Sequence, residues 1–212
     1  MANIITAGNS TNGGTAISTD TSGTLNIVTG SGSGATAITV DGSQNVTTGA
    51  NLTVTGTLTA SGGVSGGIRS GTAVASTSGT SIDFTGIPTG VKRITVMFSG
   101  TSLSSTADIL VQIGTSSGVE TTGYVSGSAS SSNSTSGYVM RLAIAARTMY
   151  GAMQILNLTG NNWVSWHAAN STNISDIWGG GGKTLSGTLD RVRITSTSTD
   201  TFDAGSINIL YE

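Results

Sequence analysis

The chain has 212 residues, of which only 8% are charged, and it carries a formal net charge of −2. Gly, Ser, Thr, Asn and Ala replace the charge that an average soluble domain would carry, and a chain without a basic face is not expected to bind nucleic acid. Since there is no cysteine, disulfides, thiolate catalysis and cysteine-ligated zinc are excluded.

The sequence also gives no sign of a membrane segment. Met1–Ile5 contains no basic residue and no long apolar run, so we expect no signal peptide. No later segment stays apolar for long enough to predict a membrane-spanning helix. We therefore expect no insertion into a membrane.

Residues 1–67 contain short apolar segments separated by turn-forming residues. The apolar segments are Leu25–Val28, Ala37–Val40 and Leu52–Leu58, and Asp41–Ser43 is one of the intervening turns. Segments of this length, about a dozen residues apart, are typical of short strands in a loose repeat.

Strands this short and without an aromatic residue bury too little surface to fold alone. Two interpretations remain for residues 1–67. The segment is a flexible Gly/Ser/Thr linker, or several copies of the chain wrap around one axis and complete each other's core. The aliphatic alternation favours the second interpretation, because a linker does not need it.

The organising element of the rest of the chain is Thr80–Gly100. Glycines and a proline at Gly86–Gly90 predict a turn. After the turn, Ile94, Val96 and Phe98 alternate with more polar residues. A period of two with β-branched residues predicts a strand that buries one face.

The same alternation recurs throughout residues 68–212. The predicted faces are Ile109/Val111/Ile113, Tyr138/Met140/Leu142/Ile144, Val192/Ile194 and Ile207/Ile209/Tyr211. Tyr150–Leu158 has no clear parity, and Met140–Tyr150 also fits a short helix. Some eight strands with polar turns predict an all-β fold, in which the N-terminal segment 1–67 precedes an antiparallel, jelly-roll-like β-sandwich over 68–212. We expect the core to include Ile94, Val96, Phe98, Val111, Leu142, Val192 and Ile209.

No group of residues predicts catalysis or a cofactor. His167 is the only histidine, and a general base also needs a nucleophile and an orienting partner. Asp200 and Asp203 lie in a polar stretch that predicts a solvated turn. This turn could hold calcium with loop carbonyls, although the spacing of an EF-hand is absent. We predict no catalytic residue, no metal site and no cofactor.

The segment Gly179–Thr184 has a superficial likeness to a phosphate-binding loop. The first glycine of that motif is missing, since Asp176 and Ile177 stand where it would be, and no strand–helix context follows. We reject the motif and predict a mobile or closely packed loop.

Three residues are candidates for contact with a receptor. In a strand, Val164 and Trp166 share one face, and we assign this apolar set to the interior. Trp163 and His167 are then expected on the outer face, and Trp178 is expected in a loop before the glycines. Trp163, His167 and Trp178 are therefore the receptor-contact candidates. The alternative is that the tryptophans pack against a neighbouring subunit.

Two segments resemble structural proteins of tailed bacteriophages. LTVTGTLTASGGV (Leu52–Val64) is similar to tail-fibre segments that connect a virion-bound base to a distal domain. DFTGIPTGVKRITVMF (Asp83–Phe98) is similar to the start of the C-terminal β-domain in such virion appendage proteins. Together the two segments cover about a seventh of the chain.

The resemblance implies a homotrimeric virion protein, not an enzyme. It implies attachment to other virion proteins through the N-terminal segment, assembly in the bacterial cytoplasm, and an outer domain in contact with a host surface glycan or protein. The alternative is a capsid decoration, cement or head-fibre protein that stabilises the shell. A third hypothesis, a small carbohydrate-active enzyme, lacks a pair of carboxylates placed to face each other across a sugar.

Overall fold

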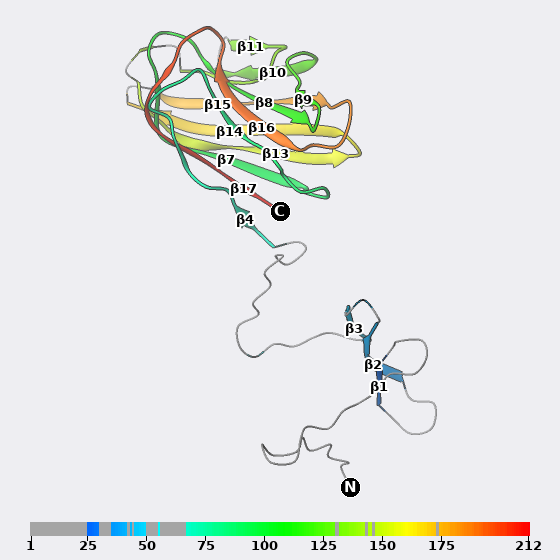
Figure 1. The fold of residues 1–212 in the computed structure, drawn as a ribbon. Helices are drawn as coiled ribbons and strands as arrows, with labels where there is room; N and C mark the ends of the chain where they lie inside the picture. The colour runs from blue at the N-terminus through cyan, green and yellow to red at the C-terminus, as the bar shows by residue number, and fades with distance from the viewer. Residues whose placement is uncertain are drawn as a thin grey trace. The chain divides into compact units, whose positions relative to one another are not determined.

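The structure is a computed structural model, and it divides the chain into two compact units, Met1–Ala60 and Ser61–Glu212 (Figure 1). The predicted boundary after residue 67 stays a prediction. The residues that the structure describes are 25–29, 35–41, 43, 45–49, 55, 67–129, 132–142, 144–145, 147–172 and 174–212.

In the first unit the described residues form a three-stranded antiparallel sheet. Its strands β1 (Leu25–Thr29), β2 (Ala35–Val40) and β3 (Val46–Thr48) pair in the order β1-β2-β3. Asp41 makes the turn before β3, since its carboxylate accepts hydrogen bonds from the amides of Ser43 and Asn45, both at 2.9 Å. The Asn45 side chain also donates to Asp41, and these hydrogen bonds lower the pKa of this carboxyl. The predicted strand Leu52–Leu58 lies outside the described residues, apart from Thr55.

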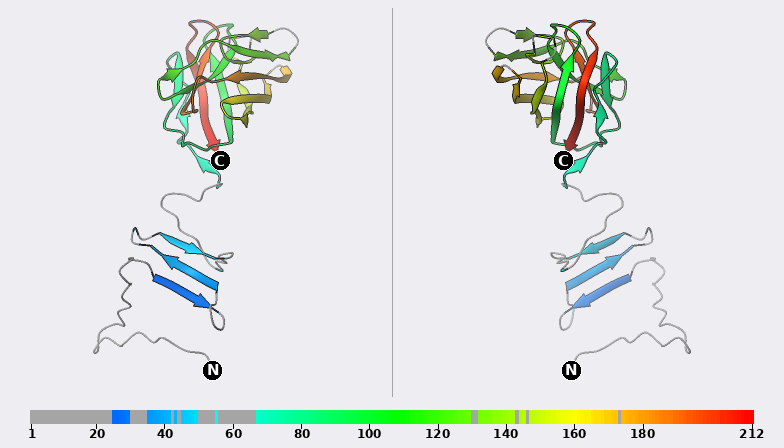
Figure 2. Two further views of the ribbon diagram at one scale, coloured as in Figure 1. Left: turned by 90° about the vertical axis from the view of Figure 1, so that its right-hand side faces the viewer. Right: turned by 90° about the vertical axis from the view of Figure 1, so that its left-hand side faces the viewer.

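The second unit is an antiparallel β-sandwich, which confirms the all-β prediction (Figure 2). Its larger sheet has nine strands in the order β11-β10-β15-β14-β13-β7-β17-β4, with β5 also paired to β17. The strands of this sheet are β4 (Arg69–Ser70), β5 (Val74–Ala75), β7 (Arg93–Leu103), β10 (Tyr124–Ser128), β11 (Ser132–Ser134), β13 (Met149–Thr159), β14 (Asn162–Ser171), β15 (Ile174–Thr184) and β17 (Phe202–Tyr211).

The smaller sheet has five strands in the order β12-β8-β16-β6, with β9 paired to β8. It is held at one edge by an ion pair between Asp83 of β6 and Arg193 of β16, in which both carboxylate oxygens accept at 2.7 Å. This contact raises the pKa of Arg193. The strands of this sheet are β6 (Ser81–Phe84), β8 (Ile109–Thr115), β9 (Gly118–Val119), β12 (Tyr138–Met140) and β16 (Arg191–Ser196).

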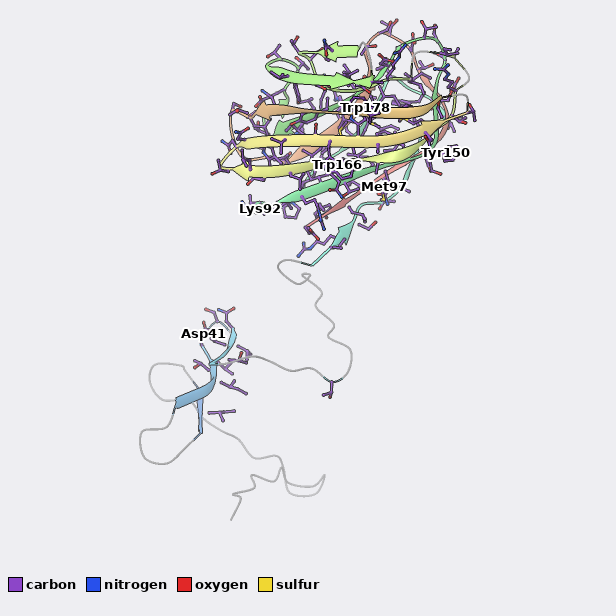
Figure 3. All side chains as sticks on the ribbon, turned by 180° about the vertical axis from the view of Figure 1, so that it is seen from behind. Asp41, Lys92, Met97, Tyr150, Trp166 and Trp178 are labelled. Carbon is purple, nitrogen blue, oxygen red and sulfur yellow. The ribbon has the colours of Figure 1, made fainter. Side chains whose placement is uncertain are left out.

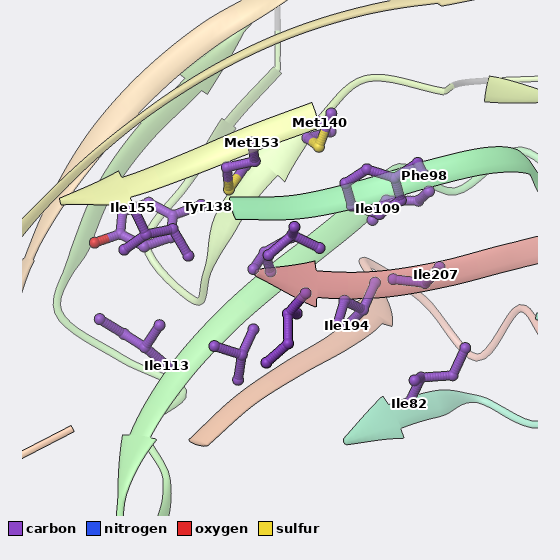
Figure 4. Packing of buried hydrophobic residues seen from close by; sticks show 14 of the residues in the cluster. Ile82, Phe98, Ile109, Ile113, Tyr138, Met140, Met153, Ile155, Ile194 and Ile207 are labelled. Carbon is purple, nitrogen blue, oxygen red and sulfur yellow. The ribbon is translucent and has the colours of Figure 1, made fainter. Parts of the chain in front are cut away.

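The core lies between the two sheets (Figure 4). Strand β7 alternates as expected, because Ile94, Val96 and Phe98 are buried while the residues between them are partly exposed. The turn before β7 has positive φ angles at Gly86 (72°) and Gly90 (91°), which residues with a side chain rarely adopt. The burial of every predicted core residue is confirmed: Ile94, Val96, Phe98, Val111, Leu142, Val192 and Ile209.

Two expectations about the middle of the chain need correction or completion. The segment after Met140 forms no helix in its described residues, and Ile144 is exposed, so it does not extend the apolar face that begins at Tyr138. Strand β13, whose parity the sequence did not define, buries Met153 and Ile155 and exposes Leu158.

Candidate functional site

The outer face of the nine-stranded sheet is the candidate site, and strand β14 shows why. Trp163 is 4% exposed and His167 is 2% exposed, whereas Trp166 is 50% exposed. The expected parity of this strand is therefore wrong. The apolar residues Val164 and Trp166 point outward, and the polar residues Ser165 and His167 are buried.

The glycine run also has a different structure from the one expected. Gly179–Gly182 lies inside strand β15, paired with β10 on one side and β14 on the other, and it is not a loop. Trp178 belongs to the same strand and is 64% exposed. Glycines carry no side chain, so they give no alternation from which a strand could be recognised.

The register brings two exposed tryptophans together. Trp178 lies opposite Ala168, and Trp166 lies opposite Gly180. The two indoles are thus diagonal neighbours on adjacent antiparallel strands, a position in which large side chains reach each other. Figure 3 shows the face that carries both, with Tyr150 and Met97 further along it.

A hollow of about 500 Å³ opens beside Trp178. Three glycines form much of its wall, together with the β10–β11 hairpin, in which Ala129 has a positive φ of 38°. None of the described residues that line the hollow has an ionisable side chain. Its lining residues are Gly127, Ser128, Ala129, Asn133, Trp178, Gly179 and Gly180.

Other apolar side chains continue the same face. Val125, Tyr150 and Val164 are all exposed large hydrophobic residues. Val164 lies opposite Gly182, which in turn lies opposite Val125, so the apolar surface crosses three neighbouring strands. A contiguous exposed apolar patch on a soluble domain commonly marks an interaction surface.

Under the hollow, a buried histidine and a buried serine meet across a glycine. His167 of β14 and Ser128 of β10 both lie opposite Gly179 of β15, and His167 Nε2 is 2.9 Å from Ser128 Oγ. A side chain at position 179 would prevent this contact, because an added Cβ would lie 2.6 Å from the imidazole and overlap the carbonyl oxygen of Gly127.

This pair does not have the geometry of a nucleophile and its base. Burial lowers the pKa of His167 to about 4, so its imidazole is neutral at pH 7. Its Nδ1 has no hydrogen-bond partner among the described residues, whereas a catalytic triad needs an acidic group there. Ser128 Oγ also accepts the amide of Arg141 at 3.0 Å, and Ser126 Oγ accepts the amide of Val139 at 2.8 Å. These serines therefore satisfy backbone donors at the edge of β12.

The remaining charged candidates are also engaged in structural contacts. Lys183, which follows the glycines, is buried and forms an ion pair with Glu120 at 2.6 Å. Burial raises the pKa of Glu120, but hydrogen bonds from Lys183 and Ser186 outweigh it and leave that pKa below its usual value. Asp200 accepts the amide of Ala107 at 2.9 Å. No three His, Cys, Asp or Glu side chains gather as a metal site within the described part of the chain.

The three receptor-contact candidates therefore do not lie together in the structure. Trp178 is on the surface, as a contact role requires, while Trp163 and His167 are inside and do not accompany it. Sequence reasoning missed Trp166, which the parity error had placed in the core. The signal that could have found it is Ser128, a polar residue of β10 that gives an inward His167 a hydrogen-bond partner.

Comparison with protein-family models, with curated proteins and with solved structures gives no match to this chain. Among the described residues, no helix is long and apolar enough to cross a membrane.

Proposed function

We propose that the chain is a structural protein of a bacteriophage particle, without catalytic activity, that assembles as a homotrimer. The N-terminal segment is the part that joins the copies to each other and to other virion proteins. The β-sandwich is the outer domain, which contacts the host surface. The protein is therefore assembled in the bacterial cytoplasm and is located in the virion.

One observation carries the proposal of assembly. In the three-stranded sheet of the first unit, no residue whose side chain the structure describes is buried, and Ile27 and Val46 are exposed. A small sheet in which no described side chain is fully buried does not offset the entropy of ordering its backbone. Contact with further copies supplies the missing buried surface.

The support for a place in a phage particle is the resemblance of Leu52–Val64 and Asp83–Phe98 to fibre segments. The same resemblance is also compatible with a second candidate function, that of a capsid decoration, cement or head-fibre protein. In that case the N-terminal strands hold the shell, and the outer domain only protrudes.

The experiment is to delete residues 1–66 and follow the chain into particles. The full chain is expected to incorporate, and the remaining β-domain is expected to be soluble but absent from purified particles. Incorporation of the shortened chain at the level of the full chain would contradict the proposed attachment. Counting copies per particle then separates the two functions, because a tail carries few fibres and a capsid has many binding positions.

A further inference from the structure

The strongest unassigned feature of the outer domain is the hollow beside Trp178. The indole is 64% exposed, although a large aromatic side chain gains from burial. Its neighbours across the strands are small: Ala168 on β14, and Gly127 and Ser128 on β10 next to the glycines of β15. None of these cross-strand neighbours is bulky enough to cover the indole, so much of it remains available to a ligand.

The lining of the hollow defines the chemistry of that ligand. It offers one aromatic surface, backbone from three glycines and the exposed carboxamide of Asn133, which both donates and accepts hydrogen bonds. The described residues that line it carry no charged side chain. A neutral sugar matches this set, because a pyranose has one face of C–H groups that stacks on an indole and a rim of hydroxyls that bind amides.

The position of Trp166 extends the site beyond one ring. Trp166 is the diagonal neighbour of Trp178, at a backbone separation of about 7 to 8 Å for such pairs. Gly180 lies opposite Trp166 and also lines the hollow, so no side chain from β15 stands between the hollow and the second indole. A short oligosaccharide can therefore contact both tryptophans.

The geometry points to a binding site for a neutral oligosaccharide, formed by Trp178, Trp166 and the hollow at Gly127, Asn133 and Gly180. A second copy of the chain fits this place less well, because a flat sheet face would leave the hollow of about 500 Å³ unfilled. This inference deepens the proposed contact with the host surface and rests on that role for its biological setting.

The test is binding of the full-length protein to an array of immobilised glycans. The array carries neutral glucose-, galactose- and N-acetylhexosamine-containing oligosaccharides, with sialylated and uronic-acid glycans for comparison. We expect binding to at least one neutral structure. Trp178→Ala should lower that affinity by about tenfold or more, and Trp178→Phe should retain part of it because an aromatic surface remains.

Leu158→Ala is the matched control, since Leu158 is equally exposed on the same sheet but lies away from the hollow. It should leave glycan binding unchanged. The melting temperature and the oligomer mass of every variant are measured alongside. With both unchanged, loss of binding in Trp178→Ala supports the inference.

Three results would overturn it: no neutral glycan bound, binding of charged glycans in preference, or equal binding by Trp178→Ala. Dissociation of the oligomer by Trp178→Ala would also overturn it and would identify this face as a subunit interface. A different result would contradict the proposed function while leaving the binding site supported. A monomeric wild-type protein that binds neutral glycans through Trp178 supports the site and contradicts the trimer.

Discussion

At the scale of single residues, Phe98 is the clearest test of the core. Its side chain is 4% exposed between the two sheets, while Met97, next in the strand, is partly exposed on the outer face. Phe98→Ala should lower the free energy of unfolding by about 3 to 5 kcal/mol, because it removes a large apolar group and leaves a cavity. Met97→Ala is the control, and it should lower the free energy of unfolding clearly less. Denaturant titration measures both, and a loss below about 1 kcal/mol for Phe98→Ala would contradict the packing.

His167 gives a prediction about pH. In the folded chain burial lowers its pKa to about 4, while in the unfolded chain it stays near 6.5. Below about pH 6.5 His167 is protonated in the unfolded chain but stays neutral in the folded chain. The free energy of unfolding therefore falls with pH until the folded histidine also protonates near pH 4. The loss from this residue is of the order of 3 kcal/mol.

The measurement is the free energy of unfolding of the wild type and of His167→Gln between about pH 7 and pH 4. Carboxylates titrate in both proteins, so their difference isolates the histidine. The stability of the wild type relative to the variant should decline as the pH falls. A difference that does not change with pH would show that His167 is accessible to protons in the folded chain.

Single residues also show what the sequence could predict. Strand β7 has apolar residues on one side and polar or long residues on the other, so its parity was readable and is confirmed at Phe98. Strand β14 has a tryptophan on each face. The decision there depended on which face found polar partners, and Ser128 supplies one from a strand about forty residues away. Alternation within one strand contains no information about such a partner.

At the scale of elements, strand β15 controls how the sheet is built. Its glycines let β10 approach so closely that a side chain would not fit at Gly179. On the same strand, an added Cβ at Gly182 would meet only the carbonyl oxygen of Trp163 at 3.9 Å, an ordinary contact. The two glycines thus lie on the same strand but differ in the room available for a side chain.

Gly179→Ala should therefore destabilise the domain by about 2 kcal/mol or more, because backbone on β10 must move and the contact between His167 and Ser128 is lost. Gly182→Ala should change stability by less than about 1 kcal/mol. Thermal or denaturant unfolding of the two variants checks this. Equal effects would mean that the close approach of β10 and β15 does not depend on glycine.

The same strand marks the limit of sequence analysis for elements. The number and spacing of apolar segments predicted an antiparallel sandwich, and this fold class is confirmed. A run of four glycines has no side-chain pattern and predicts a loop, although pairing with β10 and β14 makes it a strand. Trp178 was misplaced with it, and the hollow that it borders was not predictable.

At the scale of the whole molecule, the two units are expected to differ in how they depend on other copies. The second unit has its own core between two sheets, whereas the described side chains of the first unit are not buried. Deleting residues 1–66 should therefore leave a folded β-domain with nearly the same melting temperature as the outer domain of the full chain. Circular dichroism during heating measures this, and aggregation or loss of the cooperative transition would contradict the independence of the domain.

Assembly through the N-terminal segment is measured by sedimentation equilibrium of the full-length protein and of residues 67–212. The full chain should sediment with three times its mass of 21.0 kDa, and the fragment should sediment as a monomer. A full-length chain that sediments as a monomer while its N-terminal sheet is folded would show that this segment does not assemble the chain.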